Sequence, residues 1–267
     1  MSRRRSAVTS VAALVGAGAL VAALTAGHTS GHTPGHTAQP PPDVAPSAPS
    51  PVASTPNEPT TTTARVRSFD RARHSTADPH SPWVVVNKKH RIRPLDFRPD
   101  VGLVRGYQVA EQAVTPLTRL LAEADRRGLG LKIASAFRSS AYQDGVYSGI
   151  VRTRGQRAAD RVSARPGHSE HQTGLAVDLV VPVLPATNFT PAFADTRAGR
   201  WLAREAWRYG FIIRYQRGSE QLTGYRAEPW HLRYVGRPLA AELRRLRYPT
   251  LEEYFSITGG DYRVGMP

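Results

Sequence analysis

The chain has 267 residues, a formal net charge of +15 and no cysteine. The absence of cysteine excludes both lipid attachment through a thiol and a disulfide framework. So high a positive charge would suit a nucleic-acid-binding protein, but no recognisable nucleic-acid-reading motif accompanies it, and we expect no nucleic acid partner.

The first residues are typical of an export signal. Arg3, Arg4 and Arg5 supply positive charge, residues 7–26 form an uncharged run rich in Ala, Val and Leu, and small residues close the run. We expect residues 1–27 to be a cleaved signal peptide. The alternative is a retained membrane anchor, because the run is near the length that spans a bilayer. Either reading predicts a protein outside the cytoplasm, secreted or held at the cell surface.

Residues 28–64 contain nine prolines and hardly any large apolar side chain. Such a composition cannot build a core and predicts a disordered, partly extended Pro/Thr/Ser-rich tether. Histidines recur there at every fourth position, but the intervening glycines and proline rule out the helix that would align them as metal ligands: His28, His32 and His36. Residues 65–267 then form one folded domain, which carries +14 of the net charge.

The first elements of this domain are expected between residues 83 and 150. Residues 83–87 are a β-prone run, and the basic residues 88–93 after it predict a solvated loop. Apolar residues recur at helical spacing over residues 109–127. Pro116 would either kink this helix or start a new one capped by Thr115. A strand over 129–137 and a helix near 142–150, capped by Ser139 or Ser140, complete this half.

The second half of the domain is richer in strands. Residues 175–181 form an apolar strand interrupted by Asp178, a carboxylate that needs a cation if it is buried. Thr196 can cap a helix that runs to Tyr209, and further strands are predicted over residues 211–215 and 230–235. Helices and strands do not alternate regularly, which favours an α+β fold with a small antiparallel sheet.

Two segments carry the residues of a metal site. His168 and His171 precede Asp178, and Glu228 stands three residues before His231. Imidazole nitrogens with one carboxylate oxygen are ligands that suit Zn²⁺. Three such ligands leave one coordination position open for water. Spacing alone makes His168 and His171 equivalent candidates.

These segments resemble the zinc D-alanyl-D-alanine carboxypeptidases of the VanY type. Ser169-x-His171, followed seven positions later by Asp178, together with Glu228-Pro-Trp-His231, matches the pattern of that family, and the resemblance runs from about Trp83 to Phe255. It implies a VanY/hedgehog-like α+β domain with the zinc site at the sheet. It also implies that zinc is held by His171, Asp178 and His231, with Glu228 as the general base.

The same resemblance implies substrate contacts. Ser135-Ala-Phe-Arg138-Ser is similar to the Tyr-Arg-Ser signature of the family, with Phe137 in place of tyrosine. Arg138 would bind the terminal carboxylate of D-alanine or polarise the scissile carbonyl. Gln143 stands where a second substrate contact is expected, and Ser169 would line the subsite.

The spacing between Glu228 and His231 does not fit a regular strand that presents both side chains on one face. Strict strand alternation would point Glu228 and His231 to opposite faces, because three residues are an odd step. Proline is favoured at the start of a strand, so Pro229 leads us to expect Glu228 in the preceding loop, free to turn toward the zinc.

The function expected from these residues is zinc-dependent D-alanyl-D-alanine carboxypeptidase activity on peptidoglycan stem peptides. One alternative is a peptidoglycan endopeptidase of the same fold. Another is a non-catalytic cell-wall-binding module, against which the intact Glu228 and ligand set speak. The positive charge of the domain also suits anionic wall polymers as partners.

Overall fold

The computed structural model describes residues 69–248 and 250–262. The predicted signal peptide or anchor (1–27), the predicted tether (28–64) and the histidines His28, His32 and His36 lie outside the described residues. Within the described part of the chain, no helix is both long enough and apolar enough to cross a membrane.

A four-stranded antiparallel sheet lies at the centre of the domain, in the strand order β3-β4-β6-β5. A separate hairpin, β1-β2, precedes it in the sequence. This arrangement confirms the α+β fold with a small antiparallel sheet. The strand bounds are β1 Val101–Val104, β2 Tyr107–Ala110, β3 Lys132–Ser135, β4 Ala176–Val180, β5 Phe211–Tyr215 and β6 Glu228–Tyr234.

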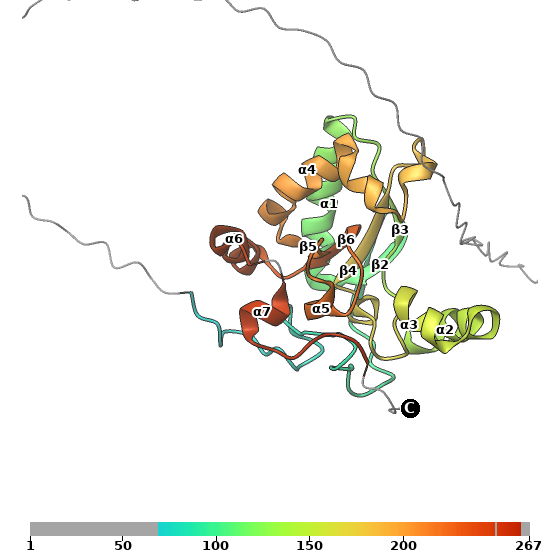
Figure 1. Cartoon of the computed structure of the whole chain (residues 1–267). Helices are drawn as coiled ribbons and strands as arrows, with labels where there is room; N and C mark the ends of the chain where they lie inside the picture. The colour runs from blue at the N-terminus through green and yellow to red at the C-terminus, as the bar shows by residue number, and fades with distance from the viewer. Residues whose placement is uncertain (1–68, 249, 263–267) are drawn as a thin grey trace, which may run out of the picture. The chain divides into compact units, whose positions relative to one another are not determined.

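Helices α1 (Glu111–Arg126) and α4 (Arg197–Glu205) cover one face of this sheet (Figure 1). Their apolar side chains form the main core with alternate residues of the central strands, Val177, Leu179 and Leu232. The first helix is a confirmed prediction, and the second is confirmed as far as Glu205, beyond which residues 206–209 form the 3₁₀ helix η4. Pro116 lies within a single continuous α1, and Thr196 caps α4 by accepting a hydrogen bond from the backbone N–H of Gly199.

A second apolar cluster joins the beginning of the domain to helices α6 (Arg237–Leu246) and α7 (Leu251–Phe255). Trp83 and Val85 enter this cluster, whereas Val84 and Val86 enter another, so the segment alternates like a strand. The predicted strand over 83–87 is nevertheless wrong, because the segment belongs to neither sheet.

The solvated loop predicted for residues 88–93 is also wrong in part. Ile92 is buried, and Lys88 is only 4% exposed. The Lys88 ammonium donates to the carbonyl of Asp160 and pairs with Asp261, and it lies over the rings of Tyr225 and Tyr262. Distant parts of the chain therefore supply the partners that allow this lysine to be buried.

Helices α2 (Ser140–Arg154) and α3 (Gln156–Val162) lie side by side, away from α1 and α4 (Figure 1). Ser139 caps α2 by accepting from the N–H of Tyr142, as expected. Hairpin β1-β2 was not predicted, although Arg105-Gly106 is its turn and both residues have positive φ. The remaining short helices are η1 Glu170–Thr173, η2 Pro185–Thr187, η3 Pro191–Asp195, η4 Ala206–Tyr209 and α5 Glu220–Thr223.

Candidate metal centre

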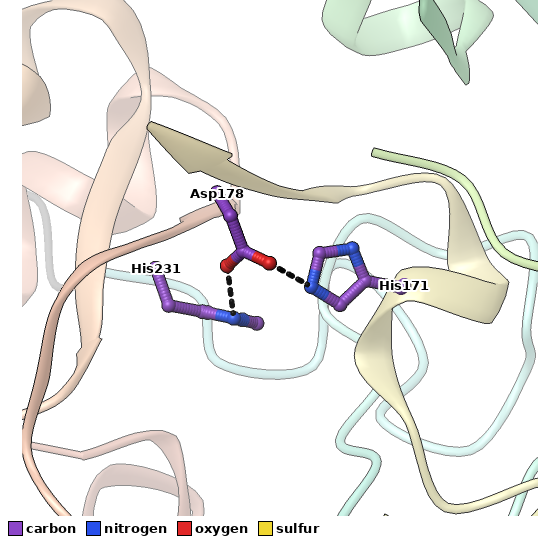
Figure 2. Close-up of side chains that lie close together, drawn as sticks. All are labelled: His171, Asp178 and His231. Carbon is purple, nitrogen blue, oxygen red and sulfur yellow. Dashed lines mark ion pairs between the residues drawn. The ribbon is translucent and has the colours of Figure 1, made fainter. Parts of the chain in front are cut away.

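Asp178 of β4 and His231 of β6 are direct partners across the central strand pair. Val177, Leu179 and Leu232 point into the core beneath α1 and α4. Because side chains alternate along a strand, Asp178 and His231 emerge together on the opposite face. Their side chains meet there, with His231 Nδ1 3.1 Å from Asp178 Oδ1 (Figure 2).

His171 reaches the same point from η1. The turn closes at Gly174, whose φ of +69° is the left-handed conformation that glycine adopts readily, and a Cβ there would lie 2.7 Å from the backbone nitrogen of Ala110. This close packing fixes η1 against the end of β2. His171 Nε2 then lies 3.1 Å from Asp178 Oδ2, and the imidazoles of His171 and His231 stand 5.0 Å apart, nearly perpendicular (Figure 2).

The donor set fits a metal ion. His171 Nδ1 lies 2.7 Å from the carbonyl oxygen of Ala136, so this nitrogen carries the hydrogen and Nε2 presents a lone pair to Asp178. Two acceptors that face each other at 3.1 Å repel unless a cation lies between them. Asp178 Oδ1, moreover, is buried and makes no hydrogen bond of normal geometry within the described chain.

The spacing of these atoms also suits zinc. One ligand atom from each of His171, Asp178 and His231 can be chosen so that all lie within 4.8 Å of one another. Ligands of a tetrahedral zinc ion, at bond lengths of about 2.0–2.1 Å, would be about 3.3 Å apart. Small side-chain adjustments would therefore bring the three ligand atoms to the spacing of a zinc site.

Burial and neighbouring charges shift the pKa values of the three side chains in different directions. Burial and the nearby Arg138 lower the pKa of His171, which keeps its imidazole neutral. Burial opposes ionisation of Asp178, but the imidazoles of His171 and His231, when protonated, outweigh it and hold the pKa of the carboxyl well below its usual range. Burial also disfavours the charged form of His231, yet contacts with Asp178 and Glu170 raise its pKa to about 9. Metal binding at His231 would therefore release a proton.

Glu228 shares the face of His231 through an irregularity in the sheet. Ile213 pairs with Leu232 and Tyr215 pairs with Glu228, so β6 takes four steps where β5 takes two. This bulge breaks the strict alternation and brings Glu228 Oε2 to 3.7 Å from His231 Nδ1. The expectation that Glu228 lies in the preceding loop is wrong, because Glu228 is the first residue of β6. Burial raises its pKa to about 7.

Of the residues assigned to substrate, Arg138 lies beside Asp178 of this cluster. Arg138 Nη1 donates to Ser135 Oγ at 2.7 Å and lies 3.7 Å from Asp178 Oδ2. Gln143 is buried, and its amide donates to Ser163 Oγ and to the carbonyl of Ala164, which anchors α2. Ser169 is buried immediately before η1. Arg138 Nε and Gln143 Oε1 have no hydrogen-bond partner in the described chain.

The structure separates the two histidines that spacing left equivalent. His168 Nδ1 contacts the carbonyl oxygen of Asn87 at 2.8 Å, and its ring packs against Tyr262. His171, and not His168, therefore faces Asp178.

Sequence reasoning missed Glu170, whose carboxylate lies 3.3 Å from His231 Nε2. The available signal was an acidic residue directly beside a candidate ligand.

Comparison with known proteins identifies the family that this chain resembles. The model of the VanY family, described as D-alanyl-D-alanine carboxypeptidase, matches residues 106–237. YodJ of Bacillus subtilis (strain 168), named provisionally as a carboxypeptidase, is 36% identical over 188 residues, which cover 67% of this chain and 68% of YodJ. The matched range of the family model includes every site residue from Arg138 to His231.

Solved structures show the same similarity. The LdcB LD-carboxypeptidase, studied for its recognition of peptidoglycan, is 34% identical with a TM-score of 0.60, over 68% of this chain and 89% of LdcB. A variant of the vancomycin-resistance D,D-pentapeptidase VanY, in complex with Zn(II), is 30% identical with a TM-score of 0.54, over 64% of this chain and 97% of VanY.

Proposed function

The chain belongs to the VanY family of D-alanyl-D-alanine carboxypeptidases, and from this premise we propose that it is a zinc-dependent enzyme that removes terminal D-alanine from peptidoglycan stem peptides. Membership makes it a peptidase. The observation that carries the proposal is the buried cluster of His171, Asp178 and His231 with Glu228 beside it. We propose that this activity lies outside the cytoplasm, which the predicted export signal supports.

His171, Asp178 and His231 would hold the zinc ion. When bound, zinc would act as a Lewis acid on the scissile carbonyl and lower the pKa of water at the site. Glu228 takes the proton from the attacking water and passes it to the leaving amine. Its pKa of about 7 suits both steps, because a group that titrates near neutral pH can accept and return a proton.

Arg138 and Gln143 supply the polar contacts to substrate. Arg138 Nε is a buried donor and Gln143 Oε1 a buried acceptor, and neither atom has a partner in the described chain. A peptide terminus offers a carboxylate for the first and an N–H for the second. Arg138 would thus bind the terminal carboxylate of D-alanine, with Ser169 lining the subsite.

Release of D-alanine from the shorter tetrapeptide is a second candidate activity. The observation that favours it is the similarity to the LdcB LD-carboxypeptidase, whose identity and TM-score both exceed those of VanY. Both reactions release a terminal D-alanine and use the same zinc chemistry, so they differ in the peptide that the subsites accept.

The test is incubation of the purified protein with a pentapeptide ending in D-Ala-D-Ala and with a tetrapeptide ending in a single D-alanine. We expect loss of one alanine from the pentapeptide, detected by mass, and a rate at least about a hundredfold lower after zinc removal by a chelator. Readdition of zinc should restore the rate, which controls for damage by the chelator.

Each alternative has its own outcome in this assay. Cleavage of the tetrapeptide alone would establish the L,D activity, and cleavage of cross-linked wall fragments without release of terminal alanine would establish an endopeptidase. A protein that binds wall fragments but cuts none of the substrates would be a binding module.

We also propose that anionic wall polymers bind the domain through its arginines. Several exposed arginines lie on the neighbouring elements η4 and α6, where Arg208 and Arg244 both lie over the ring of Trp207. Salt shortens the screening length from about 10 Å at 0.1 M to about 3 Å at 1 M. Affinity for a purified phosphate-rich wall polymer is therefore expected to fall at least about tenfold over this range. Equal binding at both salt concentrations would contradict an electrostatic partner.

A further inference from the structure

Glu170 is a carboxylate that the proposed reaction does not use. It is 1% exposed and pairs with Arg214 of β5 and Arg233 of β6. Its Oε1 accepts hydrogen bonds from Arg214 Nε and Arg233 Nη1, both at 2.7 Å. Its other oxygen, Oε2, lies 3.3 Å from His231 Nε2.

The imidazole of His231 therefore stands between carboxylates on its two sides. Nδ1 faces Asp178 at 3.1 Å (Figure 2). Nε2 faces Glu170. Since a carboxylate only accepts hydrogen bonds, the nitrogen beside Glu170 must carry a hydrogen. That hydrogen leaves the lone pair of a neutral His231 on Nδ1, the nitrogen aimed at the metal cluster.

We infer that Glu170 is a positioning residue, which holds His231 in the tautomer and orientation that binds zinc. The inference rests on the proposed zinc function. Carboxylates that accept from the second nitrogen of a histidine ligand fix its ring and raise its basicity. Glu170 makes this contact from the position next to His171, so one short turn carries a candidate ligand and the support for another.

Glu170 is itself held in place by a buried ionic network. Arg214 donates to both oxygens of Glu252 in α7, at 2.8 and 2.7 Å. Arg233 donates to the backbone carbonyls of Pro82 and Val84. Removal of the carboxylate of Glu170 or of Glu252 leaves a buried guanidinium without one of its partners. This loss lowers the stability of the fold, because an unpaired buried charge is strongly destabilising.

Glu252 provides a matched control for a purely structural role. It is 2% exposed and binds Arg214, as Glu170 does, but its contacts in the described chain are to Arg214 and Asn87 and do not include His231. Glu170→Gln and Glu252→Gln thus remove the same charge from the same network, and only the first changes a group that touches the metal cluster.

The amide introduced by Glu170→Gln also has a predictable orientation. Arg214 and Arg233 both donate, so they retain the amide oxygen and turn its NH₂ group toward His231 Nε2. An NH₂ group can only donate, so Nε2 would have to accept and the hydrogen would move to Nδ1. The lone pair would then point away from the cluster.

The experiment measures zinc affinity of the full chain by competition with a chromophoric chelator. Glu170→Gln is expected to weaken zinc binding about 10- to 100-fold, and Glu252→Gln less than about threefold. The melting temperature of each metal-free variant is measured in parallel, and we expect both to be lowered. An affinity of Glu170→Gln within threefold of wild type, or an equal loss in both variants, would overturn the inference.

A measurement on the wild type covers the case in which Glu170→Gln does not fold. In the zinc-loaded protein with ¹⁵N-labelled histidine, the Nε2 proton of His231 should be strongly deshielded and slow to exchange, as expected of an N–H bonded to a buried carboxylate. A rapidly exchanging proton, or one without deshielding, would refute the contact. Failure of the wild type to bind zinc at all would instead refute the proposed function.

Discussion

Replacement of Glu228 by glutamine is expected to lower kcat at least about a hundredfold while zinc content stays near one ion per chain. Glutamine keeps the shape of the side chain but lacks the basic oxygen that accepts a proton from water. General base catalysis commonly contributes about a hundred- to ten-thousandfold in rate. Zinc binding should persist, because Glu228 is not a member of the cluster of His171, Asp178 and His231.

The geometry supports this separation of roles. Glu228 Oε2 is 3.7 Å from His231 Nδ1, close enough to reach a water molecule at the cluster. Glu253→Gln is the control, because it makes the same chemical change on an exposed residue of α7 and should leave kcat and zinc content unchanged. Near-normal turnover of Glu228→Gln, or loss of zinc from it, would refute the assignment.

The position of Glu228 shows what the sequence could predict. The Glu-Pro-Trp-His segment identified the residue, and its odd spacing from His231 led to the expectation of a preceding loop, whereas Glu228 lies in β6 next to an irregularity. The form of the irregularity depends on β5, whose pairing shifts between Ile213 and Tyr215. A register shift is a property of two strands together, so the segment around Glu228 alone could not reveal it.

Elements with a signal in their own residues were predictable. Helix α1 follows from the spacing of its own apolar residues, and the start of α4 from its cap Thr196. Gly210 ends η4, which continues α4. Asp178 was identifiable because a carboxylate interrupts an apolar strand. In each case the signal lies within a few residues of the element that it predicts.

The burial of Glu170 and of Lys88 had no such local signal. Glu170 binds Arg214 and Arg233, which are 44 and 63 residues farther along the chain. Lys88 pairs with Asp261, 173 residues away, so a basic run that predicted a solvated loop contains a buried lysine. The burial of such residues depends on tertiary partners, and local polarity alone favours the surface.

Substitution of any one of His171, Asp178 and His231 by alanine is expected to weaken zinc binding at least about a hundredfold, the upper range for loss of a group that merely supports a ligand. Removal of a ligand leaves too few protein atoms to hold the ion in a tetrahedral site. The measurement is zinc affinity by chelator competition, with metal content of the purified protein as a second reading.

His168→Ala is the matched control, because it removes the same side chain only three residues from His171. His168 is partly buried, contacts the carbonyl of Asn87 and packs against Tyr262, so its loss should lower stability modestly and leave zinc affinity within about threefold. His171 differs because Ala136 fixes its Nδ1 hydrogen and so directs the lone pair of Nε2 toward Asp178. Stoichiometric zinc in purified His171→Ala, or loss of zinc from His168→Ala, would reverse the assignment of these two histidines.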